Sequence, residues 1–165
     1  AITSTQMERK SGKAAEVLGK ASLQKGDTII ISSNTGINTV PVEAALYAKQ
    51  KGLTVVCVTS KTISEQLKPR SAIGKHLCDV SDIVIDNHAP FGDGVFTAPG
   101  TNQVTGGAST FGSLFIAQRI VLKIENLYLK NGEIPPILRS ANIPGGDEFN
   151  AKAVALYRTR IPALS

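Results

Sequence analysis

The stretch DTIIISSNTGINTVPVE, residues 27–43, decides the fold of this chain because it joins an apolar run to a polar turn and a helix start. Residues 28–32 are predominantly apolar, as expected of a parallel strand that is covered on both faces. The hydroxyl-rich turn that follows ends near Thr39, where Asn38 or Thr39 can cap a helix whose first turn tolerates Pro41. We therefore predict a strand, a turn and a helix in this order.

The neighbouring segments continue the alternation of helix and buried strand. We predict helices at residues 5–24 and 41–51 and strands at residues 54–59 and 82–86, with Gly52 ending the second helix. Such alternation builds a doubly wound parallel sheet, in which the polar turns after the strands meet at one edge. The predicted fold class is therefore α/β, a three-layer doubly wound parallel sheet with the ligand crevice at that edge.

The C-terminal half of the chain has a different pattern. Residues 87–107 are rich in glycine, proline, asparagine and threonine and predict a long irregular loop. A helix is predicted from Ser109, its cap, to about Lys130, and a closing helix at residues 148–157 is predicted to have Asp147 as its cap. The longer helix is apolar on more than one face, which predicts burial in the core or in the interface of a homodimer or homotetramer.

The turn after the first strand has the composition of an anion-binding site. Backbone N–H groups at a helix start have no intrahelical acceptor and carry positive partial charge, and neighbouring hydroxyls add donors for phosphate oxygens. Many α/β domains have a similar turn and bind no phosphate there, so this alternative stays open. Topology places one further hydroxyl, after the second strand, at the same edge. The candidate phosphate or substrate ligands in this part of the chain are Ser33, Asn34, Thr35, Gly36, Asn38 and Ser60.

The motif Ser33-x-Thr35-Gly36-x-Asn38, followed by Glu43, resembles the Ser-x-Ser-Gly-x-Thr loop of SIS (sugar isomerase) domains. Thr35 stands in place of the second serine of that loop and Asn38 in place of its closing threonine. Both keep a polar side chain that can reach a phosphate. The resemblance points to a subgroup of uncharacterised SIS proteins regarded as phosphosugar or phosphoheptose isomerases, and it implies a flavodoxin-like sheet topology. The other matching segments are residues 4–9, residues 84–87 with residues 92–93, and residues 139–150.

The resemblance implies that the ligand is a phosphorylated sugar and that the reaction is aldose–ketose isomerisation, which needs a base and an acid. Glu148 is the first candidate for the catalytic acid or base. Glu43 is the second, with a structural or sugar-contacting role as its alternative. The resemblance also places Ser140, Asn142 and Asp147 at the sugar site of the same or a neighbouring subunit.

Two departures from the subgroup bear on the chemistry. Phe149 stands where the subgroup usually has histidine. The first strand of a SIS domain, with its Gly-x-Gly-x-Ser turn and the glutamate of phosphoheptose isomerases, has no counterpart before Ala1. We therefore expect an N-terminally truncated SIS domain, with a complete small domain as the alternative. The alternatives to an isomerase are a phosphosugar lyase or etherase and a non-catalytic phosphosugar sensor.

Length and composition agree with one globular α/β domain, and the resemblance implies that residues 1–165 form a single SIS domain. The formal net charge is +5, but the basic residues are spread along the chain and aromatic residues are scarce, which favours an anionic small ligand over nucleic acid. Neither the cysteines, Cys57 and Cys78, nor the histidines, His76 and His88, have metal-ligand spacing, so we predict no disulfide, metal or cofactor. The chain has no apolar run of bilayer length and no signal-peptide pattern, so we expect a cytoplasmic protein with no membrane partner.

Overall fold

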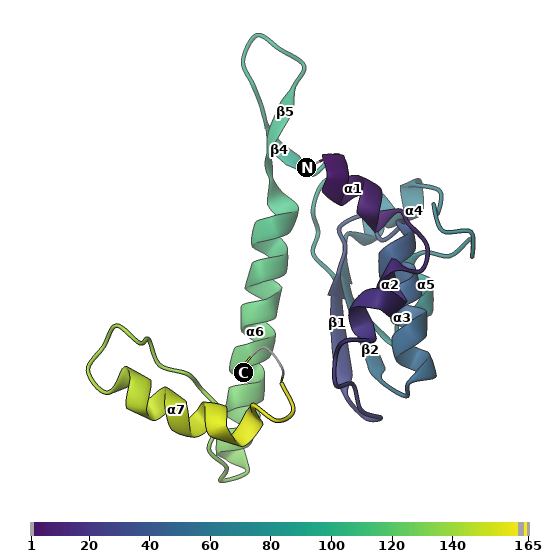
Figure 1. The fold of residues 1–165 in the computed structure, drawn as a ribbon. Helices are drawn as coiled ribbons and strands as arrows, with labels where there is room; N and C mark the ends of the chain where they lie inside the picture. Colours follow the sequence, from purple (N-terminus) through teal and green to yellow (C-terminus); the bar gives the residue numbers. More distant parts are fainter. Residues whose placement is uncertain (1, 162–163, 165) are drawn as a thin grey trace. The chain divides into compact units, whose positions relative to one another are not determined.

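The computed structural model describes residues 2–161 and residue 164 (Figure 1). The chain divides into two compact units, the first ending at residue 117 and the second beginning at residue 118, and each is described by itself. Among the described residues, none of the helices combines the length and the hydropathy of a membrane-spanning segment. That the whole chain forms one SIS domain stays a prediction.

The first unit contains a parallel sheet of β1 (Thr28–Ser32), β2 (Thr54–Thr59) and β3 (Ile83–Asp86), in that spatial order. In the register, Ile31 of β1 lies beside Cys57 of β2. These strands agree with the predicted ones to within one residue. Because all the strands run in the same direction, the turns that follow them lie at one edge of the sheet, as predicted. The predicted α/β class with a parallel sheet is therefore confirmed.

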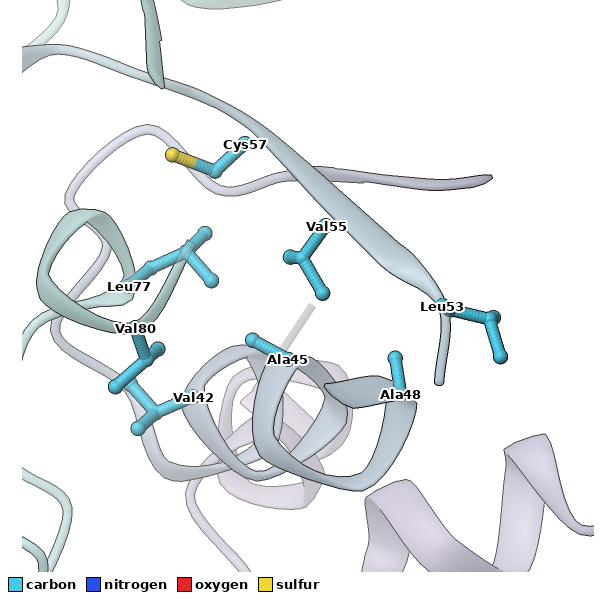
Figure 2. Close-up of a cluster of buried hydrophobic side chains, with 8 residues drawn as sticks. All are labelled: Val42, Ala45, Ala48, Leu53, Val55, Cys57, Leu77 and Val80. Carbon is cyan, nitrogen blue, oxygen red and sulfur yellow. The ribbon is translucent and has the colours of Figure 1, made fainter. Parts of the chain in front are cut away.

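The helices α3 (Thr39–Gln50), α4 (Lys61–Gln66) and α5 (Leu77–Val80) connect the strands. α3 packs on β1 and β2, and α5 packs on β2, so the core lies between these helices and one face of the sheet. The small alanines of α3 allow close approach to the β-branched residues of β2, as Figure 2 shows. The buried core side chains are Val42, Ala45, Ala48, Leu53, Val55, Cys57, Leu77 and Val80.

The opposite face of the sheet is less covered. Ile30 of β1 and Ile83 of β3 are 47% and 50% exposed, while Val56 between them in the register is buried. The expectation that the first strand is covered on both faces is therefore wrong for the described residues. The apolar run correctly predicted a strand of a parallel sheet, but only its other face is packed against a helix.

The N-terminal segment forms two short helices, α1 (Ile2–Glu8) and α2 (Lys13–Leu18), instead of the single helix predicted at residues 5–24. The break is at Gly12, whose φ of 81° is left-handed and incompatible with a continuous helix. The apolar periodicity of this segment is helical on both sides of the break, so periodicity alone did not reveal it.

The prediction of a long irregular loop at residues 87–107 is wrong in part. The segment contains an antiparallel hairpin of β4 (Gly94–Thr97) and β5 (Val104–Gly107). In the register, Phe96 lies opposite Thr105. Each strand has four residues and includes glycine, which weakens the alternation that predicts strands. The side chains of both strands are mostly exposed.

The long helix α6 (Ala108–Lys130) has the predicted extent, but Ser109 is not its cap. The backbone N–H and the hydroxyl of Ser109 both donate to the carboxylate of Asp93, at 2.7 and 2.8 Å, so Asp93 satisfies the helix start. No residue of α6 is buried among the described residues, so core burial, one of the two predicted reasons for its apolar faces, is wrong. The exposed apolar residues of α6 include Phe111, Leu114, Phe115, Val121, Leu122, Ile124, Leu127 and Leu129.

The second unit includes the closing helix α7 (Gly146–Tyr157). Its cap is Gly145, with a left-handed φ of 74°, and Asp147 lies inside the first turn, so the prediction that Asp147 caps the helix is wrong. The side-chain amide of Asn150 donates to the carbonyl of Arg139 and accepts from the N–H of Arg139, both at 2.8 Å. This pair of hydrogen bonds attaches the backbone of Arg139 to α7.

The burial of Val55 on β2 leads to a prediction about stability. Val55→Ala removes two methyl groups from a side chain with 0% exposure, and we expect a loss of about 2 kcal/mol in the free energy of unfolding. The matched control is Val17→Ala, at a position 63% exposed on α2, which we expect to change stability by less than about 0.5 kcal/mol. Urea unfolding of both variants measures the difference, and equal losses would contradict the packing described above.

Candidate functional site

The turn between β1 and α3, residues 33–38, is held through its carbonyl groups. The carbonyl of Asn34 accepts from the N–H of Ser60 at 2.9 Å and from the hydroxyl of Thr59 at 3.1 Å. The carbonyl of Gly36 accepts from the N–H of Leu77 at 2.8 Å. Because these acceptors are occupied by the neighbouring strand end and by α5, the turn is fixed to the rest of the unit.

The N–H of Ser33 donates to the carbonyl of Val58 at 3.0 Å, but the following N–H groups of the turn have no acceptor among the described residues. Within residues 2–161, no hydrogen-bond acceptor is found for the N–H groups of residues 34–38. α3 begins directly after them and has no acidic residue in its first turn. Consecutive free N–H groups before a helix start, with the positive end of the helix dipole, form an environment that favours an anion.

Hydroxyl groups flank these amides. The side chains of Ser33 and Thr39 are 8% and 7% exposed, and Thr35 is partly exposed. None of their hydroxyls has a hydrogen-bond partner in the described part of the chain. Every fully buried side-chain oxygen or nitrogen of the described residues has a partner, so the hydroxyls of Ser33 and Thr39 reach the surface. They are donors available to a ligand, and Thr39 is one that the sequence-based set of ligands missed.

Asn38 occupies the N-cap position of α3 but makes no capping hydrogen bond, contrary to the option raised from the sequence. Its side-chain oxygen instead accepts from Nη1 of Arg70 at 3.1 Å. The N–H of Arg70 also donates to the carbonyl of Ile37 at 2.8 Å. Arg70 is absent from the ligands predicted from the sequence because it lies 32 residues beyond Asn38, in a segment without periodicity where no local pattern indicates a contact with the turn.

Two residues from the neighbouring strand ends also lie at the turn. The side-chain amide of Asn87 donates to the side-chain oxygen of Asn34 at 3.1 Å, as expected if the turns after β1 and β3 share one edge. Ser60 is fully buried, and its hydroxyl donates to the carbonyl of Ala89 at 2.8 Å and accepts from the N–H of Ile63. Ser60 therefore caps α4, and its role as a substrate ligand stays a prediction.

Glu43 lies on α3, and both of its carboxylate oxygens are engaged by the break between α1 and α2. One oxygen accepts from the hydroxyl of Ser11, and the other accepts from the N–H of Gly12 at 2.8 Å. The carboxylate thus satisfies the start of α2, which Gly12 itself cannot cap with a side chain. These contacts support the structural alternative for Glu43, and its catalytic role stays a prediction.

The remaining predicted residues belong to the second unit. Ser140, Asn142, Asp147 and Glu148 are all exposed there, and the hydroxyl of Ser140 accepts from the N–H of Asn142 at 3.3 Å. Asp147 and Glu148 are in the first turn of α7, where carboxylates interact favourably with the helix dipole. Their roles at a sugar site stay predictions.

Other ionisable groups of the first unit have structural explanations. Burial raises the pKa of the Cys57 thiol, which keeps it protonated and unreactive. A hydrogen bond from the N–H of His76, at 2.8 Å, holds the pKa of the Asp79 carboxyl below its usual value. The described residues contain no group of three histidine, cysteine, aspartate or glutamate residues that could hold a metal ion.

Comparison with known proteins agrees with the motif in this turn. Residues 1–60, which include the whole turn and all of β2, match the family model of the SIS domain. The resemblance to SIS domains is therefore confirmed over residues 1–60. Nearly the whole chain is similar to UPF0309 proteins.

These relatives match nearly the whole chain. The chain is 38% identical over 165 residues to a UPF0309 protein of Brucella anthropi, covering 99% of this chain and 66% of the relative. The identity to a UPF0309 protein of Shouchella clausii is 34%, over 95% of this chain and 64% of the relative. The identity to a UPF0309 protein of Streptomyces griseus is 37%, over 98% of this chain and 64% of the relative. The chain therefore spans about two thirds of the length of the curated relatives that it matches.

The close packing around Gly36 in the turn leads to a second prediction about stability. Gly36 has a φ of 63°, and a Cβ there would lie 3.1 Å from the hydroxyl oxygen of Thr59 and 3.4 Å from Cβ of Leu77. The matched control is Gly74, which has a φ of 69° but no heavy atom within 4 Å of the place that a Cβ would occupy. We expect Gly74→Ala to cost about 1–2 kcal/mol in backbone strain and Gly36→Ala to cost at least about 1 kcal/mol more in unfolding experiments. Equal costs would show that the turn has room to relax.

Proposed function

We propose that this chain binds a phosphorylated sugar, with the phosphate in the turn at residues 33–39. The observation that carries this proposal is the run of free N–H groups at residues 34–38, flanked by the free hydroxyls of Ser33, Thr35 and Thr39 among the described residues. Phosphate oxygens need several converging donors, and a dianion gains further from the start of α3. The match of residues 1–60 to the SIS domain supports a sugar as the rest of the ligand.

Aldose–ketose isomerisation is the reaction that we propose for the protein. A phosphate held at the turn would fix one end of the sugar, so that an acid and a base need to act only on adjacent carbons at the other end. Glu148 is the proposed acid or base because it is an exposed carboxylate in the C-terminal segment that resembles the sugar-contacting segment of the subgroup. Glu43 is the weaker candidate because its oxygens are already bonded.

A non-catalytic phosphosugar sensor is the second candidate, and a specific contact favours it. The guanidinium of Arg139 lies 3.8 Å from the centroid of the Phe149 ring, so the position usually held by histidine in the subgroup has an aromatic ring that is stacked on a cation. Such a ring cannot transfer a proton. A phosphosugar lyase or etherase stays the third possibility.

We also propose that the protein is cytoplasmic and forms a homodimer or homotetramer. The support for an oligomer is the set of large apolar side chains on α6, such as Phe115 and Leu114, which are 67% and 60% exposed in the chain. The ligand class that we propose involves neither nucleic acid nor a membrane.

Binding is tested with a panel of aldose and ketose phosphates and the same sugars without phosphate, measured by thermal shift and calorimetry. We expect only the phosphorylated sugars to raise the melting temperature. Ser33→Ala should weaken the affinity about tenfold or more, because it removes a hydrogen bond to a charged group. The matched control is Ser22→Ala, at an exposed position outside the turn, which should bind like the wild type. The proposal fails if no sugar phosphate binds, or if Ser33→Ala and Ser22→Ala bind equally well.

Isomerisation is tested by NMR in deuterated water with the sugar phosphate that binds most tightly. An isomerase incorporates deuterium at the carbon next to the carbonyl, and Glu148→Gln should reduce this rate about 100-fold or more. Glu133→Gln, at another exposed glutamate of the second unit, is the control and should keep the rate. Tight binding without deuterium incorporation would support the sensor, and release of a substituent from the sugar would support the lyase.

A further inference from the structure

Arg70 is attached to the turn at two points. Its backbone N–H donates to the carbonyl of Ile37 at 2.8 Å, and its Nη1 donates to the side-chain oxygen of Asn38 at 3.1 Å. The side chain is otherwise exposed. A guanidinium has five N–H donors in a planar fork, and the structure shows only one of them bonded to a described residue. Most of the donors of Arg70 are therefore free beside the turn.

The contact with Asn38 also changes what the start of α3 presents. An asparagine at an N-cap normally bonds its side-chain oxygen to an N–H of the first helical turn. Here that oxygen accepts from Arg70, so Asn38 makes no capping bond and leaves the N–H groups of the helix start without a side-chain acceptor. Arg70 thus engages the side chain that would otherwise cap α3, and its guanidinium adds a full positive charge beside the helix start.

We propose that Arg70 is a phosphate-contacting residue, which binds the ligand phosphate together with the N–H groups of residues 34–38 and makes the site selective for phosphorylated over neutral sugars. This inference rests on the proposed function of the turn. Arginine suits the role because its fork can bond two oxygens of one phosphate while a third donor stays on Asn38. The nearly buried hydroxyls of Ser33 and Thr39, which have no partner among the described residues, support a ligand at this position independently of Arg70.

A purely structural role makes different predictions. If Arg70 only held Asn38 in place, Arg70→Ala and Asn38→Ala would have the same effect on stability and on binding. If Arg70 contacts phosphate, its removal weakens binding also when Asn38 is alanine, and lysine at position 70 restores part of the affinity because it retains the charge.

The experiment compares the wild-type chain with Arg70→Ala, Arg70→Lys and Lys68→Ala by calorimetry. It also includes Asn38→Ala, alone and combined with Arg70→Ala. The probes are inorganic phosphate and the sugar phosphate that stabilises the wild type most in the panel described above. Lys68 is exposed and has no bonded partner among the described residues, so Lys68→Ala makes the same change in net charge two residues away. We expect Arg70→Ala to bind both probes about 10- to 100-fold more weakly, Arg70→Lys to recover part of this loss, and Lys68→Ala to stay within about twofold of the wild type.

The outcomes separate this inference from the proposed function. If the wild type binds the sugar phosphate and Arg70→Ala binds it as tightly as Lys68→Ala does, Arg70 does not contact phosphate, although the proposed function survives. If the double variant Asn38→Ala with Arg70→Ala binds like Asn38→Ala alone, the role of Arg70 is structural. If the wild type binds neither probe, the proposed function fails, and this inference fails with it. Melting temperatures without ligand identify any variant that is simply unfolded.

Discussion

The candidate site depends on one constraint, which is that the turn after β1 uses its carbonyl groups to hold itself in place. The carbonyls of Asn34, Gly36 and Ile37 accept from the next strand end, from α5 and from Arg70. Since these three carbonyl groups are bonded within the unit and the N–H groups of residues 34–38 have no acceptor among the described residues, the turn presents donors to a ligand. A turn that presented free carbonyl groups instead of N–H groups would repel an anion.

Gly36 makes this arrangement possible. Its left-handed backbone lets the peptide reverse between strand and helix, and the absence of a side chain lets Thr59 and Leu77 approach the turn closely. Glu43 shows the complementary principle further along α3. A carboxylate in the family motif satisfies the start of α2, so its place in the motif has a structural explanation that does not require chemistry. The position of a residue in a motif is therefore weaker evidence for catalysis than the free bonding capacity of its atoms.

The apolar surface of α6 and the less covered face of the sheet share one feature, which is that both expose large apolar side chains. Both are segments whose sequence predicts burial, and both retain exposed apolar side chains in the chain, such as Phe111 on α6 and Ile83 on β3. Exposed apolar area of this kind is typical of surfaces that contact other protein. This is the physical basis for expecting further protein contacts at these surfaces.

Much of the first unit could be predicted from the sequence, because the signals there are local. The apolar runs of β1 and β2, the polar turn and the Pro41 helix start each identify an element within a few residues. Local pattern failed at the break before α2 and at the hairpin of β4 and β5, where short segments with glycine have weak periodicity. The sequence by itself determined the positions of β1, β2, β3 and α3 along the chain and the polar composition of the turn after β1, whereas α4 and α5 were not predicted. Only the tertiary structure decided that Arg70 lies at the candidate site and that the oxygens of Glu43 and Ser60 are already bonded, because hydrogen bonds between residues distant in the chain cannot be predicted from the local sequence pattern.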